Sequence, residues 1–119
     1  MSQQEYKHKF DLEDRTAKFS ISILSFCRTI PVNYLSENQV KQLIKSATSI
    51  GANYMEANGS DSKRDFRSKI SICKKEAKET TYWLRILINL FPNKKEELKI
   101  LWAEAQELLL IFSAIIKNS

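Results

Sequence analysis

The chain has 119 residues, of which 43% are hydrophobic and 28% are charged, and its formal net charge is +5. These values fit one globular domain, and the presence of only two glycines and two prolines argues against an all-β fold. No apolar run approaches the ~20 residues that span a membrane, and the polar N-terminus lacks the apolar core of a signal peptide. We therefore expect a single-domain cytoplasmic protein.

The first predicted helix follows a polar tail over residues 1–10 and covers residues 11–29. Asp11 is a favourable N-cap residue, and Pro31 ends the helix because proline lacks a backbone N–H. Apolar residues recur at steps of three and four, which keeps one face of a helix apolar. This stripe consists of Leu12, Thr16, Phe19, Ile23, Phe26 and Ile30.

The second predicted helix covers residues 37–58. Ser36 and Gln39 have the spacing of a capping box, and Gly59 is expected to end the helix in the left-handed region. The buried stripe is predicted to be Val40, Leu43, Ala47, Ile50 and Tyr54. Gly51 is unfavourable inside a helix, so we expect it to permit a close approach of a neighbouring helix.

The third and fourth predicted helices cover residues 63–91 and 94–117. Ser62 with Asp65, or alternatively Ser60 or Asp61, is expected to begin the third helix, and Asn93 with Glu96 to begin the fourth. The stripe of the third helix is Phe66, Ile70, Cys73, Ala77, Leu84, Ile88 and Phe91, and that of the fourth is Leu98, Leu101, Ala105, Leu108, Phe112 and Ile115. Short connections between four amphipathic helices predict an all-α, up-down-up-down antiparallel four-helix bundle.

The third helix carries a second, basic face. Its four members are spaced by seven, four and seven residues, which places them almost on one line along the helix. This basic stripe consists of Arg67, Lys74, Lys78 and Arg85, and Lys63 and Arg64 lie at its start. Together with the positive net charge, it predicts nucleic acid as a partner, although no aromatic base-stacking motif accompanies it and charged helix faces are usually only solvated.

A third face of the same helix is apolar as well. This flank consists of Ile72, Trp83, Ile86 and Leu90. Ile21, Leu24, Leu110 and Ile111 on the other helices add further apolar surface. One four-helix core cannot easily bury so much, so we expect a cyclic homo-oligomer whose interface includes the flank, the alternative being a monomer with a wide core.

The polar residues do not form a catalytic site. Two pairs lie one turn apart on helices, Asn53 with Glu56 and Glu76 with Glu79, and we interpret them as hydrogen-bonding groups that fix helix register. Di-metal bundles use Glu-x-x-His pairs, whereas the single histidine, His8, lies in the tail. Cys27 and Cys73 are read as small packing residues. We therefore expect no enzyme activity, no metal, no cofactor and no small-molecule substrate.

The segment from residue 42 to the end of the third helix resembles the bacterial four-helix-bundle family of 23S rRNA intervening-sequence proteins. The residues that match its pattern are Gln42, Leu43, Ala47, Ser49, Ile50, Asn53, Glu56, Ala57, Asp65, Phe66 and Glu79, together with Phe10, Asp11 and Leu12. Where the family commonly has two arginines this chain has Ile44 and Lys45, which weakens any RNA contact carried over there. Where the family commonly has proline, it has Gly51.

The resemblance implies an up-down bundle that tends to form cyclic pentamers. It also implies a relation to the basic accessory proteins of diversity-generating retroelements, which work with a reverse transcriptase and RNA. The biochemical role of most family members is unknown. Two functions follow as hypotheses: an oligomeric subunit that binds RNA through the basic stripe, or a protein-protein adaptor that uses the flank and binds no nucleic acid.

Overall fold

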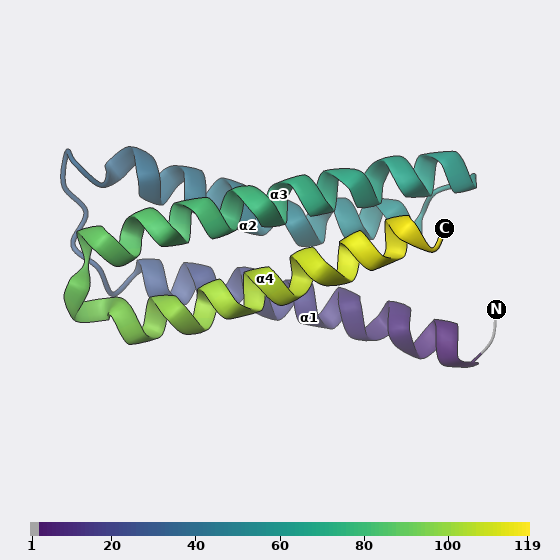
Figure 1. Cartoon of the computed structure of the whole chain (residues 1–119), viewed down its shortest axis with the longest axis horizontal. Helices are drawn as coiled ribbons and strands as arrows, with labels where there is room; N and C mark the ends of the chain where they lie inside the picture. The colour runs from purple at the N-terminus through teal and green to yellow at the C-terminus, as the bar shows by residue number, and fades with distance from the viewer. Residues whose placement is uncertain (1–2) are drawn as a thin grey trace.

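A computed structural model of the chain describes residues 3–119, with side chains from residue 12 onward. Over this range it contains α1 (Gln3–Cys27), α2 (Glu37–Asn58), α3 (Lys63–Leu90), the short 3-10 helix η1 (Pro92–Lys94) and α4 (Lys95–Lys117), and no strand. The four α-helices run alternately up and down in a bundle of 47 × 22 × 21 Å (Figure 1). In the same range, no helix is long and apolar enough to cross a membrane.

The core confirms the predicted apolar stripes. All members of the α1 and α2 stripes are buried, and the exceptions on the other helices are Phe66, Ile88 and Ile115, which are half-buried against the core. Thr16 is the one polar member of the α1 stripe, and it is buried because its Oγ1 donates to the carbonyl of Leu12 at 2.8 Å. A helix accommodates a buried threonine in this way because the hydroxyl bonds to its own preceding turn.

The start of α1 differs from the prediction. The helix begins at Gln3, so Asp11 lies inside it and most of the predicted tail is helical. Residues 1 and 2 lie outside the described range. Residues 3–10 contain neither glycine nor proline, and glutamine, glutamate and lysine favour helix, so nothing in the local sequence stops the backbone before Asp11.

The predicted caps have mixed outcomes. Ser62 accepts a hydrogen bond from the backbone N–H of Asp65 at 3.1 Å, as predicted. Ser36 makes no side-chain cap, because its Oγ instead accepts from the backbone N–H of Asn33 in the preceding turn. Gly59 has φ −91°, so it is not left-handed. The turn of η1 comes before α4, so Asn93 is not its cap.

The four helices do not pack equally closely. Each helix packs along its neighbour in sequence, but α1 and α4 touch over a short stretch only. In Figure 1 these two helices diverge toward the end where α1 begins and α4 ends. The open side of the bundle therefore lies between α1 and α4, while α3 lies in the middle, packed against both α2 and α4.

Candidate nucleic-acid interface

The basic stripe of α3 is exposed along its whole length. Arg67, Lys74, Lys78 and Arg85 all lie at the surface, as do Lys63 and Arg64 in the first turn of the helix. Within the part of the chain whose side chains are described, no aspartate or glutamate forms an ion pair with any of these six residues, whereas Lys18, Lys41 and Lys69 each pair with one. The stripe is therefore a row of positive charge that the surrounding chain does not neutralise.

The stripe follows the side of α3 that faces α4. Arg67 marks one end, because its Nη1 donates to the backbone oxygen and the Oγ of Ser119, both at 3.3 Å. At this end there is a cavity of about 640 Å³ between the start of α3 and the end of α4. It is lined by Lys63, Arg64, Phe66, Arg67, Asn118 and Ser119. The stripe thus ends in a hollow with three cationic side chains.

The apolar flank lies on the other side of α3, toward α2. Lys69 on this side donates from Nζ to Oε2 of Glu56 on α2 at 3.3 Å. Ile72 and Ile86 are half-buried, and Leu90 is 40% exposed. Trp83 is half-buried and packs against the core, so it already contributes to the stability of the single chain. The flank and the basic stripe are thus separate surfaces on opposite sides of one helix.

The polar pairs predicted to fix helix register contribute unequally within one chain. Asn53 donates from Nδ2 to the carbonyl of Ser49 in its own helix at 2.8 Å, and Glu79 is exposed. Burial and the charge of Glu79 raise the pKa of Glu76, while Lys75 and Lys45 lower it. Glu56 joins two helices through its ion pair with Lys69 on α3.

A buried hydrogen bond that the sequence analysis missed joins α2 to α3. Thr80 Oγ1 lies 2.9 Å from the Oγ of Ser46, and both residues are buried. Thr80 also bonds to the carbonyl of Glu76 at 2.8 Å, and Ser46 donates to that of Leu43 at 3.2 Å. The sequence contained a signal for this bond, because the apolar stripe passes from Ala77 directly to Leu84. Thr80 lies between them at steps of three and four, so it occupies the missing position of the stripe.

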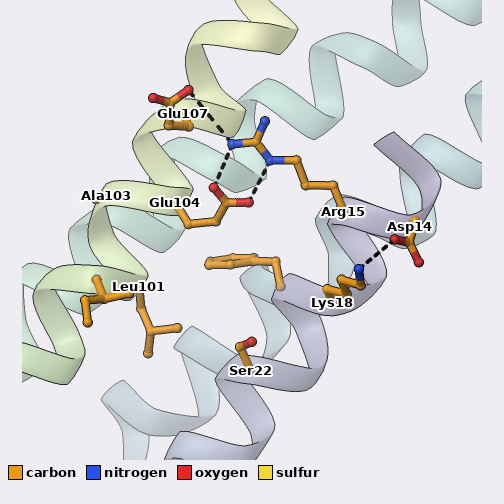
Figure 2. Close-up of a pocket in the computed structure, with 10 residues that line it drawn as sticks. Asp14, Arg15, Lys18, Ser22, Leu101, Ala103, Glu104 and Glu107 are labelled. Carbon is orange, nitrogen blue, oxygen red and sulfur yellow. Dashed lines mark hydrogen bonds and ion pairs between the residues drawn. The ribbon is translucent and has the colours of Figure 1, made fainter. Parts of the chain in front are cut away.

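A groove of about 530 Å³ lies on the open side between α1 and α4. Figure 2 shows Arg15 of α1 reaching across it to Glu104 of α4. The guanidinium donates from Nε to Oε2 at 2.8 Å and from Nη2 to Oε1 at 2.7 Å. Beside it, Lys18 pairs with Asp14 at 3.0 Å. The hydrogen bonds to Glu104 raise the pKa of Arg15, so the guanidinium stays charged, and the paired carboxylate balances that charge. The groove therefore does not extend the basic stripe.

The thiols are placed for packing. Burial raises the pKa of Cys73 to about 12 and that of Cys27 to about 11, so both remain protonated at neutral pH. Cys73 donates from Sγ to the carbonyl of Ile50 at 3.5 Å. Among the described residues, no three side chains of histidine, cysteine, aspartate or glutamate come together in a group that could hold a metal ion, and the side chain of His8 lies outside that range.

Comparison with known proteins places the bundle in a family. The family model of the 23S rRNA-intervening sequence protein matches residues 8–114. A crystal structure at 1.70 Å resolution, of a protein of unknown function from the S23 ribosomal protein family of Bacteroides thetaiotaomicron, is similar to this chain with a TM-score of 0.76. The two are 32% identical, and the match covers 88% of this chain and 97% of that one. No curated protein matches the chain.

The family model spans all four helices, including α4, which the sequence resemblance did not cover. The structural match agrees with the up-down bundle. The chain therefore belongs to the family of 23S rRNA-intervening sequence proteins.

Proposed function

We propose that this protein is a non-enzymatic, cytoplasmic, homo-oligomeric subunit that binds RNA through the basic stripe of α3. The observation that carries the proposal is the row of exposed cations without carboxylate partners among the described side chains. At a rise of 1.5 Å per residue, Arg67 and Arg85 are separated by about 27 Å, a length over which a nucleic-acid strand offers several phosphates. The net charge of +5 favours the same kind of partner.

The proposal is tested by reversing two charges in the middle of the stripe. The double variant Lys74→Glu, Lys78→Glu should bind a generic structured RNA at least about tenfold more weakly at low salt, because contacts are lost and repulsion is added. The slope of log K against log salt should fall by about 0.7 for each lost phosphate contact. Fluorescence anisotropy at two salt concentrations measures both quantities.

A matched control separates local from overall charge. The double variant Lys18→Glu, Lys41→Glu changes the net charge by the same amount, but these exposed residues lie on α1 and α2 and not on the stripe. It should retain most of the RNA affinity. If both double variants lose the same amount of RNA affinity, RNA is attracted by the overall charge of the protein and not by the stripe. If the stripe variant binds RNA as tightly as the wild type, the stripe is only a solvated face.

The homo-oligomer is supported by the apolar flank on the α2 side of α3. Leu90 is 40% exposed, and Ile86 and Ile72 are half-buried, so a second copy could cover surface that one chain leaves open. The flank and the stripe lie on different sides of α3, so an oligomer built on the flank would leave the stripe exposed. The pentamer and the relation to accessory proteins of diversity-generating retroelements stay predictions from the family resemblance.

Light scattering of the purified protein tests the oligomer. Leu90→Asp should dissociate it, because Leu90 is 40% exposed on the flank, whereas Leu90→Met keeps the position apolar and should leave the mass unchanged. These variants are preferable to Trp83→Asp because Trp83 packs against the core, and its loss would also destabilise the single chain. A monomeric wild-type protein would remove the interface hypothesis.

The alternative function is a protein-protein adaptor that uses the same flank. The specific observation in its favour is that Leu90 and Ile86 are apolar and incompletely buried. A defined oligomer that does not bind RNA even at low salt would favour this function over the first.

A further inference from the structure

An aromatic side chain lies beside the basic stripe, where the sequence analysis expected none. Tyr82 is 55% exposed on α3. It follows Lys78 by four residues and precedes Arg85 by three, so both cations are its neighbours on the helix surface. Lys75, seven residues earlier, lies two turns away on nearly the same line and is also exposed. An exposed phenol ring thus lies between two cations, with the exposed carboxylate of Glu79 three residues before it.

The orientation of this ring is fixed by its neighbour. Tyr82 and Trp83 have ring centroids 5.0 Å apart and planes inclined at 74°, an edge-to-face arrangement. Trp83 in turn packs against the core, so the pair is anchored to the bundle. One edge-to-face contact covers at most one face of the Tyr82 ring, and the high exposure of the side chain agrees with a free second face. This contact restricts the orientations of the ring before any ligand arrives, which lowers the entropic cost of binding.

We infer that Tyr82 stacks on an unpaired base of single-stranded RNA while Lys78 and Arg85 contact the phosphates on either side of it. This inference rests on the proposed function and specifies its ligand. Bases inside a duplex are already stacked on their neighbours, so an aromatic side chain reaches a base face only in a single strand, loop or end. Basic residues next to a stacking ring are the combination that single-stranded nucleic acid requires.

The test compares tyrosine variants on two probes, an unstructured polyuridylate RNA of about 12 nucleotides and a duplex RNA of similar length. Tyr82→Ala should weaken binding of the single strand by about 5- to 150-fold, because stacking on one base contributes that much affinity. Binding of the duplex should not change. Tyr82→Phe keeps the ring and should bind the single strand like the wild type.

Tyr34→Ala is the matched control, since this tyrosine is 88% exposed in the connection between α1 and α2. It should leave both affinities unchanged. A base analogue whose fluorescence is quenched on stacking, placed in the single strand, should be quenched by the wild type and by Tyr82→Phe but not by Tyr82→Ala. Circular dichroism verifies that all variants fold.

The outcomes distinguish this inference from the proposed function. If Lys74→Glu, Lys78→Glu weakens RNA binding but Tyr82→Ala weakens neither probe, or both probes equally, the stacking role is wrong and the basic interface stands. If the wild type binds neither probe at low salt, the proposed function itself fails. A selective loss on the single strand, restored in Tyr82→Phe, establishes the stacking role.

Discussion

A Cβ atom placed on Gly51 would lie 3.1 Å from the Oγ1 of Thr16 and 3.3 Å from its Cβ. Gly51 therefore marks a place where the backbone of α2 comes close to α1. Both residues are buried, and the Thr16 hydroxyl is held by the carbonyl of Leu12. The glycine is required by packing, because its own φ lies outside the left-handed region.

We predict that Gly51→Ala destabilises the bundle. Alanine improves helix propensity by up to about 1 kcal/mol, but overpacking a close contact typically costs about 1–3 kcal/mol. The free energy of unfolding should therefore fall by roughly 1 kcal/mol, measured by urea unfolding followed by circular dichroism. Adding Thr16→Ala removes the nearest atom and should make the Gly51→Ala change less damaging.

Ala52→Gly provides the control at the next, exposed position of α2. It should lower the free energy of unfolding by about 1 kcal/mol through helix propensity alone. This decrease should be the same with and without Thr16→Ala. A Gly51→Ala variant that is more stable than the wild type would contradict the close-approach explanation.

The contact at Gly51 illustrates what the sequence could predict. A glycine within an apolar helical segment indicates a close approach, and this was expected, but its partner could not be identified as Thr16. The pairing depends on how two helices are rotated and shifted against each other, and no local pattern encodes that. The apolar stripes were predictable because a period of 3.6 residues is a property of one helix.

Helix ends and interhelical polar contacts were less predictable. Ser36 had two competing partners, the next turn of α2 and the preceding loop, and the structure uses the loop through Asn33. Glu56 was singled out for its place in a repeated pattern, but its partner Lys69 comes from another helix. The exposure of Tyr82 also required the structure, because neither periodicity nor composition distinguishes a free ring from a covered one.

The Arg15–Glu104 pair should couple α1 to α4. A double-mutant cycle with Arg15→Ala and Glu104→Ala is expected to give a coupling free energy of about 0.5–1 kcal/mol, since both side chains are about one-third exposed and water screens the pair. The bidentate geometry favours the upper part of this range. The coupling should fall as salt concentration rises.

Asp14 and Lys18 supply the comparison, because they form a more exposed pair within α1 alone. Their cycle should give about 0.3–0.5 kcal/mol, the value typical of helical pairs four residues apart. A coupling at Arg15–Glu104 no larger than this would mean that the pair contributes little to closing the open side of the bundle.

The thiols should react slowly in the folded protein. Burial raises the pKa of Cys73 to about 12 and that of Cys27 to about 11, so little thiolate is present at about pH 8. Alkylation by iodoacetamide, followed by mass spectrometry, should be much slower than in urea. Cys27 should react before Cys73, because it is only partly buried. Equal rates in the folded and unfolded protein would contradict this placement.

Glu76 should make the stability of the bundle depend on pH. Burial first, and the charge of Glu79 second, raise its pKa in the folded protein, while Lys75 on its own helix and Lys45 on α2 act in the opposite direction. The folded state then binds the proton more tightly than the unfolded state. The contribution of this group to the free energy of unfolding is therefore greatest when the carboxyl is protonated. This contribution decreases as pH rises through and above 4.5, the usual pKa of a glutamate carboxyl.

Glu76→Gln removes this titration and keeps the shape of the side chain. Urea unfolding between about pH 4 and pH 7 should show that the difference in stability between the variant and the wild type shifts in favour of the variant as pH rises. Glu96→Gln, which removes an exposed carboxyl from the first turn of α4, is the control for the loss of one negative charge elsewhere on the bundle. Parallel curves for Glu76→Gln and the wild type would mean that the carboxylate is as well solvated in the bundle as in the unfolded chain. Glu76 lies between Ile72 and Trp83 of the apolar flank along α3. If the pH dependence of stability becomes steeper at protein concentrations at which the oligomer forms, this carboxyl lies inside the interface between copies.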